Sequence, residues 1–399
     1  MKDLTQLIRF EDLLQEAHNA LVAEEIAQGG LALGYTCYYI PVPLLNLGRC
    51  FSVRLRAPRS GSADIAGYYL TTRNCPFSRS LLERAIEGGY NFLGALIGSE
   101  TCAAMDRAQE HFTLLDLVPN PSYFTAHLDA PLKTDDASIR HYRRQLQLKV
   151  LDPLAERYGV DTSEESLRKA IAEHNHLGEV IRAIGDFRKL ERPPITSYEF
   201  HVICLVAQVC PYARIIGPLE ETLDEVKRRK ADPQNRYRAR IVLVGSEVDD
   251  PALTKLIEEC GLYVAADRYC YGSLPEFEEI RIKPDEDALT ALSRHYLTSS
   301  RCPRFMNQDK VDERKSYIRQ LVQEYHAQGV VFETMKFCEF WGYERVLASY
   351  ILSNEMDIPC CTVEHDYILS GQGQLRTRFQ AFGESLELKR IQKQREAQA

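Results

Sequence analysis

Cysteine is the residue type here whose number and placement could support chemistry beyond ordinary packing. The chain has twelve cysteines in 399 residues. Among those in polar or turn-like sequence, Cys75 and Cys302 precede a proline, as ligands of iron–sulfur clusters often do. Six in all stand in polar or turn-like sequence: Cys37, Cys75, Cys102, Cys270, Cys302 and Cys338. We interpret these six as candidate cluster ligands. The alternative is that they are small buried core residues, as most free cysteines are.

The other six cysteines are predicted to be structural. Three fall at core-like positions of helices, one lies in a turn, and two are adjacent on an apparent strand, where neighbouring side chains point to opposite faces. In that order they are Cys204, Cys210, Cys260, Cys50, Cys360 and Cys361. The sequence has no Cys-x-x-Cys run of the ferredoxin kind, so local spacing alone does not identify a cluster.

Composition and missing motifs exclude several functions. The net charge of −8 and the pI near 5.8 disfavour binding to nucleic-acid backbones, which needs a basic surface. There is no Gly-x-x-x-x-Gly-Lys phosphate loop and no Gly-x-Ser-x-Gly elbow, and Gly371-Gln-Gly373 lacks the third glycine of a dinucleotide site. His174 and His176 lack metal-ligand spacing and are predicted to lie at the surface.

No membrane span or secretory leader is expected. The sequence has no run of eighteen apolar residues and no charged-then-apolar start. We therefore predict a cytoplasmic protein. Thiols stay reduced in that compartment, so the twelve cysteines do not indicate a disulfide framework.

Short apolar runs alternate with stretches of helical spacing in two parts of the chain, which predicts an α/β fold with parallel sheets covered by helices. The expected strands are 31–39, 51–57, 92–98 and 123–128 in the first part, and 240–245, 262–266, 329–334 and 358–364 in the second. In each part a strand runs into a polar loop, a cysteine (Cys102 or Cys338) and a helix start. Ligands bind at such strand ends, and the N–H groups of a helix start are expected to lower the pKa of the thiol.

The predicted organisation has five parts. These are an N-terminal helical segment (1–30), a first α/β domain (31–132), a helical section (133–235), a second α/β domain (236–386) and a charged tail (387–399). Within the helical section, Thr162-Ser-Glu-Glu165 is expected to form a capping box that opens a helix. The polar, basic stretch 228–240 is a candidate linker.

Nine motifs together carry a family resemblance. They are GYTCYYIP (34–41), FSVRL (51–55), NCPFSRS (74–80), GSETCAAMDR (98–107), VLVGSEVDDP (242–251), ADRYCYGS (266–273), MKFCEF (335–340), VEHD (363–366) and GQLRTRFQAFGE (373–384). With these motifs the chain resembles the D-component family of 2-hydroxyacyl-CoA dehydratases and the related benzoyl-CoA reductase subunits. The similarity extends over residues 31–387.

The resemblance implies two flavodoxin-like domains joined by a helical section, in an oxygen-sensitive iron–sulfur protein. In the dehydratases three cysteines, which match Cys75, Cys102 and Cys338 here, bind a [4Fe–4S] cluster with one open iron site. A separate ATP-hydrolysing iron–sulfur activator supplies the electrons, which agrees with the missing phosphate loop. The family also implies a dimer, either of identical chains or of two related subunits.

One branch of the family binds a double-cubane [8Fe–9S] cluster, and the chain resembles that branch at Cys37 and Cys270. Each of the two cubanes takes three thiolates, and with Cys302 the chain supplies six. We therefore favour an ATP-dependent low-potential reductase. The alternatives are a [4Fe–4S] subunit of a 2-hydroxyacyl-CoA dehydratase or benzoyl-CoA reductase, and a non-catalytic cluster-binding scaffold.

Two departures from the family pattern leave the substrate open. Pro41-Val-Pro43 stands where the family often has Pro-Glu-Glu, and the motif around Cys270 lacks its final arginine. Arg54, Arg376 and Arg378 are candidate contacts for a phosphate or CoA group, although surface ion pairs would explain them equally well. No catalytic residue can be named from the sequence.

Overall fold

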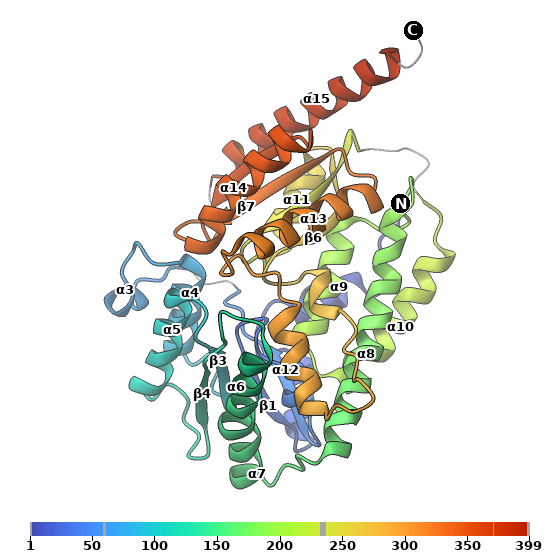
Figure 1. Ribbon diagram of the computed structural model, residues 1–399. Coiled ribbons are helices and arrows are strands. Elements are labelled where there is room, and N and C mark those ends of the chain that lie inside the picture. The colour runs from blue at the N-terminus through green and yellow to red at the C-terminus, as the bar shows by residue number, and fades with distance from the viewer. Residues whose placement is uncertain (1, 59–60, 232–236, 370, 397–399) are drawn as a thin grey trace.

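Two four-stranded parallel sheets form the framework of the molecule (Figure 1). The computed structural model describes residues 2–58, 61–231, 237–369 and 371–396. The first sheet has the order β2-β1-β3-β4 and the second the order β6-β5-β7-β8, so both follow the same topology. The strands are β1 Leu31–Tyr35, β2 Cys50–Arg54, β3 Ala95–Ser99, β4 Phe124–Leu128, β5 Ala239–Gly245, β6 Leu262–Arg268, β7 Gly329–Met335 and β8 Cys360–His365. This confirms the predicted α/β class.

The central strands are apolar on both faces because helices cover both sides of each sheet. Every residue of the central strands β3 and β7 is buried, and so is every residue of the edge strand β6, which explains why continuous apolar runs predicted these strands. The predicted strand 31–39 ends early, at Tyr35. The chain turns there, and Cys37 therefore lies at the edge of the sheet rather than within it.

Helices make up most of the remaining described chain (Figure 1). They are α1 Leu7–Leu13, α2 Ala20–Ala27, α3 Ala66–Tyr69, α4 Pro76–Ile86, α5 Ala103–Leu114, α6 Asp136–Leu146, α7 Asp152–Tyr158, α8 Glu164–Asp186, α9 Ser197–Val209, α10 Tyr212–Arg228, α11 Ala252–Glu259, α12 Ala288–Thr298, α13 Gln308–Glu324, α14 Glu339–Glu355 and α15 Gln372–Glu396. A π-helical turn, Gln147–Leu151, joins α6 to α7. Short 3-10 turns lie at Val42–Leu45, Phe187–Lys189 and Leu274–Phe277.

Helix α9 joins the two halves of the molecule. It is buried along its whole length and packs against β2 of the first sheet and β6 of the second. A capping box begins the helix, in which Thr196 and Glu199 satisfy each other's backbone N–H groups. The capping box predicted at Thr162 is wrong. There Ser163 is the N-cap residue of α8 and accepts from the backbone N–H of Ser166.

Three of the cysteines predicted to be structural, Cys204, Cys210 and Cys260, are buried as expected. Cys360 and Cys361 do point to opposite faces of β8, because they pack against different core clusters. The prediction of a turn at Cys50 is wrong. This residue is buried and pairs with Leu31 as the first residue of β2. Burial and packing therefore account for the structural set.

The structure also corrects the prediction that His174 lies at the surface. The segment that follows the Leu274–Phe277 turn packs along α8, where Asn175 donates to the carbonyl of Ile280 at 2.9 Å. His174 is half-buried and lines a cavity together with Phe277, and burial lowers its pKa to about 3. His176 is exposed as predicted and pairs with Glu220.

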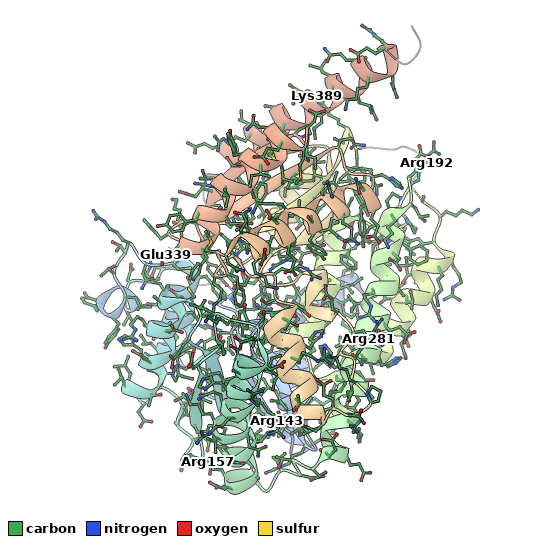
Figure 2. All side chains as sticks on the ribbon, viewed as in Figure 1. Arg143, Arg157, Arg192, Arg281, Glu339 and Lys389 are labelled. Carbon is green, nitrogen blue, oxygen red and sulfur yellow. The ribbon has the colours of Figure 1, made fainter. Side chains whose placement is uncertain are left out.

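Charged side chains cover the outside of the molecule. The labelled cations Arg157 and Lys389 lie at opposite ends of the view (Figure 2). None of the helices within the described residues has the length and apolar character needed to cross a membrane. The predicted linker 228–240 includes residues 232–236, and the predicted tail 387–399 includes residues 397–399. Residues 232–236 and 397–399 lie outside the described residues.

Candidate functional site

The carboxyl ends of the two sheets meet at one cavity, of about 110 Å³. Ligands in open α/β sheets bind at such ends. Residues that follow β1, β2 and β3 line it from the first sheet, and residues that follow β5, β6 and β7 line it from the second. The six candidate cysteines all contribute to the lining: Cys37, Cys75, Cys102, Cys270, Cys302 and Cys338. The fold thus gathers at one place thiols that are spread over 302 positions of the sequence, from 37 to 338.

Three of these cysteines begin helices, and we call Cys75, Cys102 and Cys338 the N-cap triad. They are the N-cap residues of α4, α5 and α14. Cys102 and Cys338 each lie three residues beyond the third strand of their own half, β3 or β7. The three thiols interact electrostatically, since Cys75 and Cys102 both raise the pKa of Cys338. Three helix N-termini therefore point positive dipole ends at one group of sulfurs.

Burial outweighs the helix starts in setting the thiol pKa values of the N-cap triad. It raises the pKa of Cys75 to about 11 and that of Cys102 to about 12. The first backbone N–H groups of α4 and α5 oppose this rise, but none of the three thiols makes a capping hydrogen bond. The expected lowering of these pKa values is therefore wrong for the chain by itself. A buried thiolate becomes favourable once a metal cation is bound to it.

The other three cysteines lie in loops, and we call Cys37, Cys270 and Cys302 the loop triad. Cys37 and Cys270 each follow a strand by two residues, and Cys302 lies between α12 and α13. Their thiols also interact, because Cys302 raises the pKa of Cys270 and Cys37 raises that of Cys302. Cys37 lies within 3.6 Å of the hydroxyl of Thr101, the neighbour of Cys102. The two triads are therefore adjacent.

Arg54 attaches the loop triad to the first sheet. Its side chain is fully buried at the end of β2, and its Nη1 donates to Glu276 at 2.7 Å. Its Nη2 donates to the carbonyl of Cys270, and its guanidinium lies 4.1 Å from the centre of the Tyr271 ring. Arg54 is thus a buried structural cation at the cavity. It is neither a surface ion pair nor a free phosphate contact.

The other two candidate arginines lie elsewhere. Arg376 is partly exposed and pairs with Glu259 at 2.8 Å, which agrees with the surface ion-pair interpretation. Arg378 donates to the carbonyl of Thr362. Neither of them lines the cavity.

A buried ionic network fixes the Cys302 loop. Arg268 donates to the carbonyl of Ser300 at 2.7 Å, and Arg314 donates to that of Cys302 at 3.4 Å. Both Nε and Nη2 of Arg314 bind the carboxylate of Glu344, at 3.1 and 2.9 Å. Glu344 belongs to α14, the helix that Cys338 begins, so the network couples the loop triad to the N-cap triad.

The lining includes functional candidates that the sequence did not reveal. Burial raises the pKa of Glu247 to about 8, and its Oε2 has no hydrogen-bond partner within the described part of the chain. Trp341 donates its indole N–H to Cys270 Sγ at 2.9 Å. Glu247 lies inside the VLVGSEVDDP motif and Trp341 directly follows MKFCEF. Position next to a recognised motif is the signal that could have identified them.

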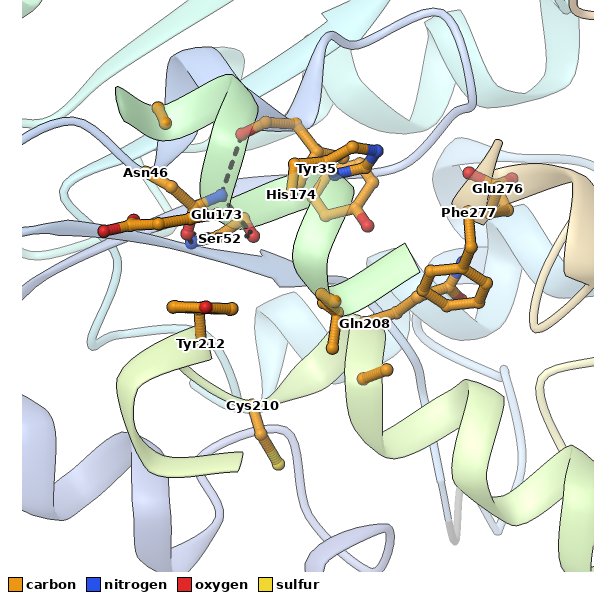
Figure 3. A pocket seen from close by; sticks show the side chains of 14 residues that line it. Tyr35, Asn46, Ser52, Glu173, His174, Gln208, Cys210, Tyr212, Glu276 and Phe277 are labelled. Atoms are coloured by element: carbon orange, nitrogen blue, oxygen red, sulfur yellow. Dashed lines mark hydrogen bonds between the residues drawn. The ribbon is translucent and has the colours of Figure 1, made fainter. Parts of the chain in front are cut away.

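A second, smaller cavity shares the lining residue Glu276 with the first. Figure 3 shows this smaller cavity from close by. Its volume is about 40 Å³, enough for a small number of water molecules and too small for a CoA group. Glu276 lines both cavities, and Figure 3 shows it near Phe277, away from the end where Asn46, Ser52 and Glu173 lie. The larger cavity is therefore the better candidate for a cofactor.

The placement of the six thiols around one cavity is compatible with a bound iron–sulfur cluster. Among the described residues, no three His, Cys, Asp or Glu side chains are placed to hold one metal ion. In an iron–sulfur cluster each thiolate bonds to a different iron, so the ligands surround a volume instead of converging on a point. Six thiols that line one cavity have this distribution.

Comparison with known proteins agrees with this architecture. The family model described as 2-hydroxyglutaryl-CoA dehydratase, D-component, matches residues 37–386. The (R)-phenyllactyl-CoA dehydratase beta subunit of Clostridium sporogenes is 22% identical, over 94% of this chain and 97% of its own length. One of the benzoyl-CoA reductase subunits of Thauera aromatica is 21% identical, over 89% of this chain and 91% of its own.

A third relative is the (R)-2-hydroxyglutaryl-CoA dehydratase subunit beta of Acidaminococcus fermentans. It is 22% identical, over 96% of this chain and 100% of its own length. These relatives are named as subunits of dehydratase or reductase enzymes. The family match covers every strand except β1 and includes all six cysteines of the cavity. The chain therefore belongs to the 2-hydroxyglutaryl-CoA dehydratase D-component family.

Proposed function

We propose that the chain holds a double-cubane [8Fe–9S] cluster on its six cavity cysteines and works as a low-potential reductase. The observation that carries this proposal is the pair of adjacent cysteine triads around one cavity. A double cubane takes three thiolates on each half, and two triads match that demand. When bound, such a cluster would store electrons and pass them to a substrate at low potential.

The residues around the cavity are suited to a buried, negatively charged group. The N-cap triad presents three helix N-termini, whose positive dipole ends favour negative charge. Arg54 and Arg268 add cationic side chains to the lining, although the family motif's final arginine is missing. Aromatic side chains, including Tyr39 and Trp341, restrict the access of water. Hydrogen bonds and burial of this kind tune cluster potentials.

The family resemblance implies that the electrons would come from a separate ATP-hydrolysing activator protein, which agrees with the missing phosphate loop. Relatives named as subunits support a dimeric assembly, of two copies or of two related chains.

The second candidate is a [4Fe–4S] subunit of a 2-hydroxyacyl-CoA dehydratase or benzoyl-CoA reductase. Two observations favour it: the relatives carry those names, and each cysteine of the N-cap triad begins a helix, whereas those of the loop triad do not. In this case Cys75, Cys102 and Cys338 would be the ligands, and the loop triad would be structural.

Anaerobic analysis of iron and sulfide separates the two candidates. About eight irons per chain support the double cubane, about four support the dehydratase type, and none overturns cluster binding. Cys37→Ser and Cys270→Ser should each lower the iron content if the loop triad binds metal. The matched control is Cys260→Ser, a buried cysteine outside the cavity. Full iron content in both loop-triad variants would contradict the six-thiolate proposal.

Catalysis is tested by mixing the loaded chain with a reduced activator, ATP and either an acyl-CoA or a small electron acceptor. Substrate-dependent oxidation of the activator is the expected result. A loaded chain that supports no turnover with any acceptor would instead be a cluster-binding scaffold.

A further inference from the structure

We propose that Trp341 is a positioning residue that raises the reduction potential of the group held by the loop triad, by donating its indole N–H to the sulfur of Cys270. The inference rests on the proposed function, because it concerns the cluster that the cysteines would hold. It starts from one contact, the 2.9 Å distance between Trp341 Nε1 and Cys270 Sγ. This is the closest approach of a side-chain N–H to a cavity sulfur that the structure records.

Trp341 contacts both triads at once. It is the third residue after Cys338 on α14, and its backbone N–H faces the Cys338 sulfur, which lowers the pKa of that thiol against a larger rise from burial. Its side chain crosses the cavity to Cys270 on the other triad. A single residue thus lies in the first turn after one cysteine of the N-cap triad and donates its indole N–H to one sulfur of the loop triad.

The surroundings hold the indole ring in place. The side chain is buried, with 4% of its surface exposed. Arg268 lies 5.6 Å from the centre of the ring, in the cation–π range. The same buried face of α14 is held by the bond of Glu344 to Arg314. We therefore expect the indole N–H to keep pointing at the sulfur of Cys270 when the bound cluster is reduced or oxidised.

An N–H group that donates to a cluster sulfur favours the more negative, reduced state and so raises the potential. A simpler explanation is that a buried tryptophan needs an acceptor for its N–H, and that the thiol happens to serve. The two explanations differ in their consequences. Only the first predicts a change of potential when the N–H is removed and the shape of the ring is kept.

The chain offers a clean test because Trp341 is its single tryptophan. Biosynthetic replacement of tryptophan by β-(3-benzothienyl)alanine exchanges the indole N–H for a sulfur atom and keeps the bicyclic shape. The expected result is a full iron content with a midpoint potential shifted to more negative values, in a redox titration followed by electron paramagnetic resonance. The Trp341→Phe variant should shift in the same direction, and Tyr343→Phe, on an exposed position of α14, should not shift.

Each other outcome is decisive. An unchanged potential at full iron content overturns this inference and leaves the proposed function intact. Loss of iron from both Trp341 replacements means that the residue holds the site together rather than tunes it, and this also overturns the inference. Absence of iron from the unaltered chain overturns the proposed function together with the inference.

A second measurement checks the contact without metal. In the metal-free chain the emission of Trp341 reports on its neighbour, because no other tryptophan contributes. Cys270→Ala removes the sulfur and should increase the emission, whereas Cys260→Ala should leave it unchanged. Equal emission from the Cys270→Ala chain and the unaltered chain would show that the indole and the sulfur are not in contact, and the inference would fall.

Discussion

The two cysteine triads are positioned by different means. Each member of the N-cap triad, Cys75, Cys102 and Cys338, begins a helix, so a strand, a loop and a helix start fix its position locally. The loop triad has no such support. Its backbone is held by side chains from distant elements, as when Arg54 binds the carbonyl of Cys270 across the interface between the two sheets. One half of the site depends on local structure, and the other depends on tertiary contacts.

The duplicated sheet topology explains part of this difference. Cys102 and Cys338 occupy equivalent places, three residues beyond the third strand of each half. Cys37 lies two residues beyond the first strand, β1, but the equivalent place beyond β5 holds Glu247. The repeated fold therefore supplies equivalent positions in both halves. The position beyond the third strand holds a cysteine in each half, whereas the position beyond the first strand holds a cysteine in one half only.

The largest effect that we expect is a difference in iron content between two variants, each of which lacks one cysteine from a different triad. Cys302→Ser should leave about four irons on the N-cap triad, because helix starts hold that triad without the loops. Cys102→Ser removes a thiol from the better-fixed half and should leave less iron than Cys302→Ser. Anaerobic iron analysis measures both. Complete loss of iron from Cys302→Ser would show that the two triads are equally dependent on each other.

The ionic network that couples the triads gives the next largest effect. Glu344→Gln should lower the free energy of unfolding by about 3 kcal/mol, because Arg314 and Lys315 would remain buried without a counter-charge. Urea unfolding of the metal-free chain measures the change. Glu355→Gln, at the exposed end of the same helix, is the control. If Glu344→Gln lowers the free energy of unfolding no more than Glu355→Gln does, the network does not stabilise the connection between the two triads.

The stability that His201 contributes near the loop triad should depend on pH. His201 is buried, packs against Tyr269 beside Cys270, and binds Thr254 and the carbonyl of Val248, both at 2.9 Å. Burial lowers its pKa from 6.5 to about 4, so the folded chain favours the neutral ring. Its contribution to stability is complete above pH 6.5 and is lost as the pH falls toward about 4.

The slope from this one group should reach at most about 1.4 kcal/mol per pH unit. Unfolding of the metal-free chain between pH 7 and pH 4 measures it, and His201→Gln should flatten the slope. The same substitution at the exposed His176 is the control. Equal slopes for His201→Gln and the unaltered chain would contradict a neutral, buried ring.

The smallest effect concerns capping. Serine is a strong N-cap residue, whereas the thiol of Cys102 makes no capping hydrogen bond. Cys102→Ser should therefore stabilise the metal-free chain by about 0.5 kcal/mol. Cys302→Ser should bring no such gain, because Cys302 lies in a loop and caps no helix. Thermal unfolding of the metal-free variants compares them, and a gain of equal size at both positions would mean that the helix start is not its cause.

The strands and the candidate ligands could be predicted from the sequence alone. Parallel strands buried on both faces must be apolar throughout, so runs such as 329–334 were recognisable within a residue or two of β7. The six cavity cysteines were identifiable because each stands in polar or turn-like sequence, unlike Cys204 within α9. These signals depend only on neighbouring residues, so a single sequence contains them.

How these parts meet depends on the tertiary fold. The grouping into triads, the burial of Arg54 and the contact of Trp341 with Cys270 all join residues that lie far apart in the sequence, and no spacing encodes them. The surface prediction for His174 failed for the same reason, because this side chain lines a cavity together with Phe277, about a hundred positions later in the sequence. The thiol pKa values followed burial rather than the neighbouring helix start. Burial is a property of the whole fold, since distant segments remove the water that surrounds each side chain.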